Sequence, residues 1–171
     1  MNKCVFLDRD GVLNLERGNY TSSVQDFKIL EGVQEALKLL KDKNFLLIVI
    51  TNQAGISKGL YTTEDVKNCH NFLQKEVGDV IDAIYYCPYH PEQTNSLARK
   101  PGSLMFEKAI AKFDISPEKA FMIGDKERDL IPARKLGVKT ILISKKENSP
   151  YADHKTGSLL SAAKLILEYG I

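Results

Sequence analysis

Two carboxylates stand two residues apart directly after an apolar run near the start of the chain. The run covers residues 5–7, and the next residues are Asp8-Arg9-Asp10-Gly11. Carboxylates this close together attract a cation, and the glycine lets the chain turn sharply behind them. The spacing therefore indicates acid chemistry around a bound cation at the exit of a strand.

Three more polar groups follow apolar runs farther along the chain. Residues 45–50 lead into Thr51-Asn52-Gln53, residues 81–86 precede Arg99-Lys100-Pro101, and residues 120–123 end at Gly124-Asp125-Lys126-Glu127-Arg128-Asp129. Taken alone, each of these strings is common as a helix cap, a turn or a solvated surface pair. Four strings in this order, each after an apolar run, predict a single site at which all four meet.

The apolar runs themselves predict the elements that position these groups. They are continuous rather than alternating, which is typical of parallel strands covered on both faces. We expect five such strands, at residues 5–7, 45–50, 81–86, 120–123 and 140–143, joined by amphipathic helices and followed by a last helix over residues 158–169. This order indicates an α/β fold with a doubly wound parallel sheet, whose ligands bind at the carboxyl ends of the strands.

The four strings, in this order, resemble the four motifs of the haloacid dehalogenase superfamily. Within that superfamily the stretches 8–14, 51–59, 86–88, 99–101 and 124–126 are similar to the D-glycero-D-manno-heptose 1,7-bisphosphate phosphatases and the related histidinol-phosphate phosphatases. The resemblance implies a Rossmann-like core. The short spacings between Asp10, Thr51 and Lys100 leave no room for a cap domain, so the irregular segments 14–30 and 87–102 must shape the site.

The resemblance also implies an Mg²⁺-dependent hydrolysis of phosphomonoesters. Asp8 would attack phosphorus and form an aspartyl-phosphate, while Asp10 would protonate the leaving group and then activate water. Thr51 and Lys100 would hold the phosphoryl oxygens. The Asp8 carboxylate, the Asp10 backbone carbonyl and the Asp125 carboxylate would hold Mg²⁺. Asp129 is expected to orient its neighbours rather than to bind the metal.

Four further residues are expected to bind the substrate. Arg99 has a planar fork suited to a second anion, Lys126 is expected to contact substrate or to pair with Asp8, and Asn52 and Asn19 complete the set. The implied substrate is a small phosphorylated metabolite, and the implied reaction is removal of the 7-phosphate of D-glycero-D-manno-heptose 1,7-bisphosphate. Histidinol phosphate or another sugar phosphate is the alternative on the same machinery.

One part of the chain departs from the resembled family. Many members bind zinc through Cys-x-His and Cys-x-Cys before the Arg-Lys pair, but here Tyr89 stands at the histidine position and no cysteine follows Cys87 before Arg99. A structural zinc site needs about four ligands, and Cys87 and His90, with Glu92 as a poor third, fall short of that number. We therefore expect Mg²⁺ but no zinc.

Composition restricts the remaining possibilities. The 171 residues carry 24 Lys and Arg against 22 Asp and Glu, a formal charge of +2, and the 3 cysteines lack the spacing of a disulfide framework. We expect one domain over residues 1–171, reduced thiols, no membrane segment, a cytoplasmic location and a monomer.

Two other function classes share some of these features. A signalling receiver domain also combines a phosphorylated aspartate with Mg²⁺, threonine and lysine, but its acceptor follows the middle strand, whereas Asp8 and Asp10 follow the first. A polynucleotide phosphatase would suit an open site. The near-neutral charge and the lack of a basic patch with interleaved aromatic residues argue against nucleic acid as a partner.

Overall fold

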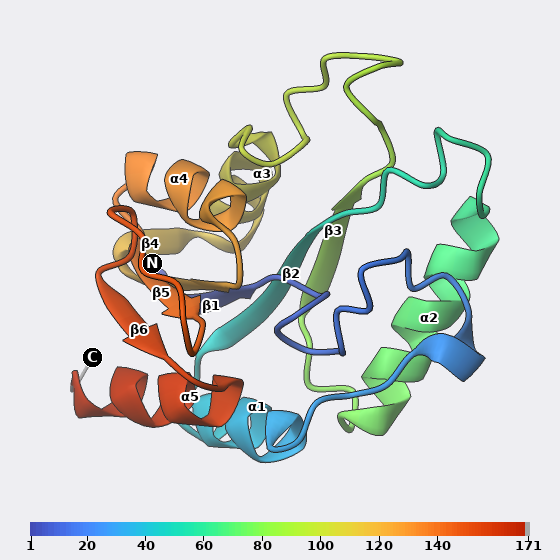
Figure 1. The fold of residues 1–171 in the computed structure, drawn as a ribbon. Coiled ribbons are helices and arrows are strands. Elements are labelled where there is room, and N and C mark those ends of the chain that lie inside the picture. The colour runs from blue at the N-terminus through green and yellow to red at the C-terminus, as the bar shows by residue number, and fades with distance from the viewer. Residues whose placement is uncertain (170–171) are drawn as a thin grey trace.

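A parallel sheet of six strands forms the centre of the structure, a computed structural model that describes residues 1–169 (Figure 1). The strand order is β3-β2-β1-β4-β5-β6, and neighbouring strands pair in parallel throughout. The doubly wound parallel sheet expected from the apolar runs is confirmed. The strands are β1 Asn2–Leu7, β2 Leu46–Asn52, β3 Ala83–Cys87, β4 Ile115–Gly124, β5 Lys139–Ile143 and β6 His154–Thr156.

Helices cover both faces of this sheet. One apolar cluster joins the sheet to side chains of α1, α2 and α5, and the other joins its opposite face to α3 and α4. Figure 1 shows α1 and α5 side by side below the sheet and α3 and α4 above it. The helices are α1 Val33–Asp42, α2 Thr63–Glu76, α3 Leu104–Phe113, α4 Glu127–Lys135 and α5 Leu159–Glu168, and a short 3₁₀ helix η1 spans Val24–Asp26.

The sixth strand is the main difference from the sequence prediction. β6 has only three residues, none of them apolar, and it pairs with β5 alone at the edge of the sheet. An edge strand of this kind has no apolar run to announce it. Strand β4 also begins earlier than predicted, because Ile115 pairs with Asn2 across an irregularity in the β1–β4 register.

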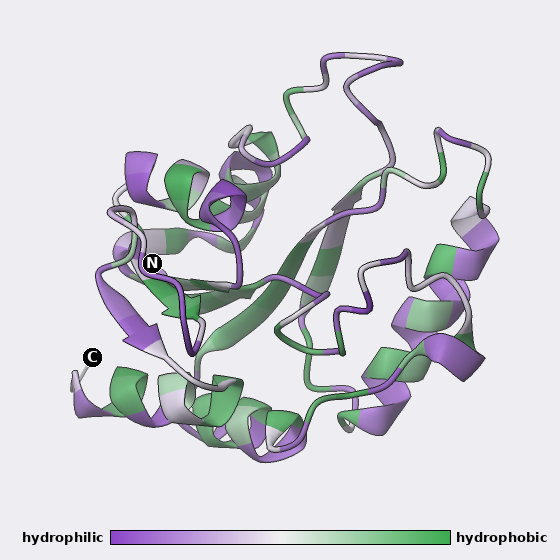
Figure 2. Ribbon diagram, in the orientation of Figure 1, coloured by the Kyte–Doolittle hydropathy of each residue, from purple (hydrophilic) through white to green (hydrophobic). Residues whose placement is uncertain are grey.

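Hydropathy follows this layering along the chain. Figure 2 shows apolar colour along the central strands and mixed colour around the helices, as expected for strands covered on both sides and helices with one buried face. Each helix within residues 1–169 is too short or too polar to span a lipid bilayer. Cys4, Cys69 and Cys87 are all buried and free.

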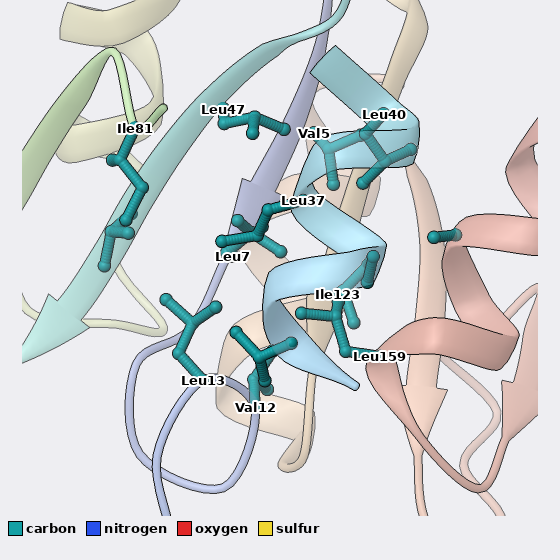
Figure 3. Close-up of a cluster of buried hydrophobic side chains, with 14 of the residues drawn as sticks. Val5, Leu7, Val12, Leu13, Leu37, Leu40, Leu47, Ile81, Ile123 and Leu159 are labelled. Atoms are coloured by element: carbon teal, nitrogen blue, oxygen red, sulfur yellow. The ribbon is translucent and has the colours of Figure 1, made fainter. Parts of the chain in front are cut away.

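The core reaches directly under the turn that follows β1. Val12 and Leu13 belong to the same buried cluster as Leu7 of β1 and Leu37 of α1 (Figure 3). Leu13 is fully buried, and its carbonyl accepts a hydrogen bond from the backbone N–H of Leu30. The backbone that carries Asp8 and Asp10 is therefore fixed on both sides, by β1 before it and by buried apolar side chains after it.

The connections at the carboxyl ends of the strands contain little regular structure. Between β1 and α1 the chain has only the single turn η1, and between β3 and α3 it has a loop without a helix or strand. These are the two irregular segments predicted from the sequence. Within the described residues neither contains a cap domain, and both border the cleft described below.

Candidate active site

Asp8 stands at the point where β1 ends, and the turn behind it is unusually tight. The Asp8 backbone N–H donates to the Ile123 carbonyl at 3.0 Å, and the Arg9 N–H donates to Asp8 Oδ1 at 2.7 Å. Gly11 has a φ of +82°, and a Cβ added there would lie 2.5 Å from Asp125 Oδ2. Glycine is therefore needed both for the left-handed turn and for the close approach of Asp125.

Lys100 connects the loop after β3 to the carboxylates of β1 and α4. Its Nζ lies 2.9 Å from Asp8 Oδ1, 2.7 Å from Asp129 Oδ1 and 2.6 Å from the Ile50 carbonyl oxygen. The Ile50 carbonyl accepts a hydrogen bond from this ammonium group, and the two carboxylates lie within ion-pair distance of it. The side chain is almost fully buried, and its single positive charge faces two carboxylates.

Asn52 holds the backbone of Lys100 from the end of β2. Its Nδ2 donates to the Lys100 carbonyl at 3.1 Å, and its Oδ1 accepts the Lys100 N–H at 3.0 Å. This reciprocal pair fixes the start of the Lys100 side chain as firmly as a ladder hydrogen bond would. Asn52 was expected to bind substrate. It does border the cleft, and it also has this structural task, which the sequence did not predict.

Asp125 and Asp129 lie at the junction of β4 and α4. Asp129 is fully buried, and its Oδ2 accepts the N–H of Lys126 at 3.1 Å in the first turn of the helix. A carboxylate at this position satisfies a free backbone N–H and is stabilised by the helix dipole. A Cβ on Gly124 would lie 2.5 Å from the Asp129 Cβ, so only glycine lets α4 begin this close to the strand.

The buried charges shift one another's pKa values. Burial, reinforced by Asp129 and opposed by Lys100, raises the pKa of Asp8 to about 7. Burial, together with Asp129, also raises the pKa of Asp125. For Lys100, burial alone would lower the pKa, but the attraction of Asp129 and Asp8 outweighs it and the pKa is raised. The site thus has more negative charge than Lys100 can balance.

These carboxylates can hold a divalent cation. Asp8, Asp125 and Asp129 each offer an oxygen, and the three oxygens lie within 4.8 Å of one another. Asp125 Oδ1 is buried and has no hydrogen-bond partner, a costly arrangement that a metal ion would relieve. An all-oxygen set suits Mg²⁺. Asp129 Oδ1 also lacks a hydrogen-bond partner, but it forms an ion pair with Lys100, so Asp8 and Asp125 are the side chains best placed as ligands.

Asp10 and Thr51 are connected through the side chain of Gln53. Both Asp10 oxygens lie 3.0 Å from Arg9 Nη2, and Asn14 Nδ2 donates to Asp10 Oδ1 at 2.8 Å. Gln53 Nε2 donates to Asp10 Oδ2 at 3.2 Å and to Thr51 Oγ1 at 3.0 Å. The acid at the end of β1 and the hydroxyl at the end of β2 are therefore linked through one amide.

A polar cleft of about 550 Å³ opens above these groups. Asp8, Asp10 and Thr51 border it, whereas Lys100 lies beneath, where 2% of its surface is exposed. Asn19, Arg99 and Lys126, which the sequence proposed as substrate-binding residues, also border the cleft. Lys126 Nζ lies 3.4 Å from Asp125 Oδ2, so this lysine pairs with Asp125 rather than with Asp8.

The loop before Arg99 is held by hydrogen bonds. Ser57 Oγ accepts the His90 N–H at 2.9 Å, and Arg99 Nη1 donates to the Tyr89 carbonyl at 3.1 Å. Cys87 is fully buried at the end of β3, while His90 Nδ1 lies 3.2 Å from Glu92 Oε2. Among the residues that the structure describes, the group of three metal-ligating side chains is the aspartate cluster, and the loop contributes none of them.

Sequence reasoning missed several residues of this site. Gln53 and Arg128 stand inside the strings that were singled out, and the signal for them was their place directly after a strand and beside Asp125. Arg9 is given no role by the sequence, yet it is fully buried. No local pattern marks Tyr61, whose hydroxyl donates to Gln53 Oε1 at 3.1 Å.

Known proteins resemble this chain in sequence and in structure. Residues 12–143 match the model of the family described as haloacid dehalogenase-like hydrolase. The D-glycero-β-D-manno-heptose-1,7-bisphosphate 7-phosphatase of Haemophilus ducreyi is 43% identical over 147 residues, which cover 81% of this chain and 80% of that protein. The protein of the same name from Helicobacter pylori strain J99 is 41% identical over 146 residues, covering 83% of each chain.

A solved structure extends the similarity over nearly the whole chain. The D,D-heptose 1,7-bisphosphate phosphatase from B. bronchiseptica, complexed with magnesium and phosphate, superposes with a TM-score of 0.90 at 25% sequence identity. The superposition covers 98% of this chain and 99% of that one. The α/β architecture is therefore shared with this neighbour, and the neighbour holds the metal that suits the aspartate cluster.

Proposed function

The chain belongs to the haloacid dehalogenase-like hydrolases, and from this premise we propose that it removes the 7-phosphate of D-glycero-D-manno-heptose 1,7-bisphosphate. The reaction class follows from the site, which combines a buried carboxylate, an adjacent acid, a buried lysine and a metal-binding cluster. The choice of substrate rests on the named relatives and on the charge of the cleft.

The charge of the cleft is the observation from this chain that favours a bisphosphate. Arg99 and Arg128 both border it, and neither forms an ion pair within residues 1–169. In this proposal Thr51 and the metal cluster hold the reacting phosphate, and the buried charge of Lys100 lies beneath it. Two further guanidinium groups therefore match a second anionic group, because planar forks bind phosphate oxygens in pairs.

In the first half of the reaction, an Asp8 carboxylate oxygen attacks phosphorus. A bond forms between this oxygen and phosphorus, the bond from phosphorus to the sugar oxygen breaks, and the departing oxygen takes a proton from Asp10. Thr51 donates a hydrogen bond from its hydroxyl to a phosphoryl oxygen, and Lys100 supplies fixed positive charge beside the growing negative charge. The sugar alcohol is then released.

In the second half, Asp10 takes a proton from a water molecule. The oxygen of this water attacks phosphorus, the bond between phosphorus and Asp8 breaks, and the Asp8 carboxylate returns to its starting form. Asp8 and Asp125, with the Asp10 backbone carbonyl, would hold Mg²⁺. When bound, Mg²⁺ offsets the repulsion between these carboxylates and an anionic substrate. Asp129 orients Lys100 throughout.

A phosphate-release screen tests this proposal. The panel contains both anomers of heptose 1,7-bisphosphate, fructose 1,6-bisphosphate, histidinol phosphate and nucleotides, and ³¹P NMR identifies which ester is cleaved. We expect the highest kcat/KM with a heptose 1,7-bisphosphate and loss of the 7-phosphate alone. Histidinol phosphate lacks a second phosphate, so an equal or higher kcat/KM for it would favour the alternative function and contradict the role given to the two arginines.

A further inference from the structure

A buried amide joins the two groups that handle protons and phosphate at this site. Gln53 is 2% exposed, and its Nε2 donates at 3.2 Å to Asp10 and at 3.0 Å to Thr51. The side-chain amide of Gln53 has two N–H hydrogens, and these two hydrogen bonds use both of them. Its backbone is equally fixed, because the Gln53 N–H donates to the Cys87 carbonyl at 2.7 Å and continues the pairing of β2 with β3.

The orientation of this amide is set from its other end by Tyr61. The Tyr61 hydroxyl accepts the Gly55 N–H at 3.3 Å and lies 3.1 Å from Gln53 Oε1. Its single proton is therefore free to be donated to Oε1, and this donation requires the oxygen of the amide to face Tyr61. The nitrogen must then face Asp10 and Thr51.

The reverse orientation would place like groups against each other. With the amide turned by half a rotation, Gln53 Oε1 would occupy the place of Nε2 beside an oxygen of the Asp10 carboxylate. Whenever Asp10 is ionised, two acceptors would then meet at about hydrogen-bond distance with no proton between them, an unfavourable contact in a buried site. Thr51 would also lose its donor, and its own proton would be drawn toward Gln53.

The observed orientation leaves Thr51 with a defined role. Thr51 Oγ1 accepts a hydrogen bond from Gln53, so the contact with Gln53 does not use the Thr51 O–H donor. Thr51 also borders the cleft. The Thr51 hydroxyl can therefore donate a hydrogen bond to a phosphoryl oxygen in the cleft. At the same time Gln53, together with Arg9 and Asn14, holds the Asp10 carboxylate in one place.

We propose that Gln53 is a positioning residue for both Asp10 and Thr51, and that the Tyr61 hydroxyl keeps its amide in the productive orientation. This inference rests on the proposed phosphatase function. Tyr61 acts only through Gln53. Loss of its hydroxyl should therefore impair proton transfer to the leaving group more than it impairs binding of the substrate.

Tyr61→Phe removes the hydroxyl and leaves the ring in place. The ring is held by Tyr20, at a centroid distance of 5.6 Å, and by Gly55, where an added Cβ would lie 2.0 Å from Tyr61 Cε1. Tyr85→Phe is the matched control, because Tyr85 packs against the apolar cluster that contains side chains of α3 and α4 and does not border the cleft. The two variants differ in whether the lost hydroxyl contacts Gln53.

The test compares leaving groups. Aryl phosphates depart without much protonation, whereas sugar phosphates need the acid. For Tyr61→Phe we expect kcat/KM, which reports the first half of the reaction, to fall about 10-fold with the heptose bisphosphate and less than about 3-fold with 4-nitrophenyl phosphate. Tyr85→Phe should match the wild-type enzyme on both. Equal losses on the two substrates, or no loss on either, would overturn the proposal.

A second variant keeps the proposal falsifiable if Tyr61→Phe does not fold. Gln53→Met retains the length of the side chain and removes both donors, so it should show the same preference for the aryl ester. In the double variant, Tyr61→Phe should add nothing to Gln53→Met, because its effect passes through the amide. Additive losses would show that Tyr61 acts independently of Gln53.

A failure of the proposed function can be distinguished from a failure of the role given to Tyr61 and Gln53. If the wild-type enzyme does not hydrolyse the heptose bisphosphate, the substrate assignment falls, and the comparison proceeds with any alkyl phosphate that it does hydrolyse. The side-chain amide protons of Gln53 give a readout without substrate. In ¹⁵N-resolved NMR we expect them to be slowly exchanging in the wild type and broadened in Tyr61→Phe, and unchanged signals would overturn the orienting role of Tyr61.

Discussion

Lys100 Nζ lies 2.9 Å from Asp8 Oδ1, and both side chains are nearly inaccessible to solvent. This ion pair brings a loop residue from the far side of β2 against the end of β1. Lys100 is shared with Asp129 at 2.7 Å, so one positive charge faces two carboxylates, with Asp125 beside them. A buried charge without a compensating partner is destabilising, and here negative charge is in excess.

The first prediction follows from this excess. In metal-free enzyme, Asp8→Asn should raise the free energy of unfolding above that of the wild type at pH 8, and the difference should shrink toward pH 5. The pKa of Asp8 is raised from 3.8 to about 7 in the folded state. Its contribution to stability is therefore complete below 3.8 and is lost as the pH rises through about 7, whereas asparagine does not titrate. Chemical denaturation with a chelator present measures the difference.

The control for this prediction is Asp42→Asn. Asp42 is exposed on α1 and pairs with Lys38, so its removal should leave the pH dependence of stability close to that of the wild type. If Asp8→Asn instead destabilised the metal-free enzyme at pH 8, the attraction of Lys100 would outweigh the repulsion among the carboxylates, and our account of the charge balance would be wrong.

The second prediction concerns Arg99. Arg99→Ala should lower kcat/KM for a heptose bisphosphate by about 10- to 100-fold, the loss of one charge-assisted bidentate contact, and barely change hydrolysis of 4-nitrophenyl phosphate. Arg134→Ala is the control, because Arg134 pairs with Asp153 away from the cleft. Equal losses on both substrates would mean that Arg99 binds the reacting phosphate or stabilises the loop, where it donates a hydrogen bond to the Tyr89 carbonyl.

The third prediction separates two metals. We expect elemental analysis of the purified protein to find no stoichiometric zinc, and a zinc-specific chelator to leave its Tm unchanged, because Cys87 and His90 lack further ligands of the kind that a structural zinc needs. Removal of Mg²⁺ should stop catalysis, and adding it back should restore activity. One zinc per chain would contradict the prediction and require ligands that we have not identified around the loop.

The fourth prediction concerns a buried histidine on α2. His70 packs edge-on against Tyr86, and burial, with a smaller effect of Arg9, lowers the pKa of His70 to about 4. Because the folded pKa lies below the ordinary 6.5, the neutral ring supports the fold above pH 6.5, and this support is lost as the pH falls toward 4. The loss should be roughly 3 kcal/mol.

Replacement of His70 by Gln tests whether His70 causes this loss of stability at low pH. The variant should lose less stability than the wild type between pH 7 and pH 4, as measured by the denaturation midpoint at each pH. His154→Gln serves as the control, since His154 is only half-buried and lies on the edge strand β6. Parallel curves for wild type and His70→Gln would show that His70 does not titrate within this window.

Much of the site could be predicted because its residues follow apolar strands. Asp8, Thr51 and Asp125 each come directly after a run that cannot face water, so the fold class alone brings them to one edge. β6 and the partners of Lys100 could not be predicted in this way. A three-residue polar strand has no pattern of its own, and Asp129 resembles any acid in the first turn of a helix until the loop after β3 brings Lys100 against it.

The contact between Tyr61 and Gln53 illustrates the same limit. Tyr61 lies in the connection between β2 and α2, where no periodicity fixes the direction of a side chain. Its position depends on the absence of a side chain at Gly55, a feature of packing rather than of pattern. The expectations of a single domain, a monomer and a cytoplasmic location stay predictions.

The most direct test of the central claim is to trap the phosphorylated enzyme. During turnover of heptose 1,7-bisphosphate, rapid acid quenching followed by peptide mass spectrometry should find phosphate on Asp8, formed at least as fast as the sugar product and gone once the substrate is consumed. Asp8→Asn should show neither the adduct nor turnover, because the nucleophilic charge is removed without a change of shape. Turnover with no adduct on Asp8, or with the phosphate on another residue, would contradict the account.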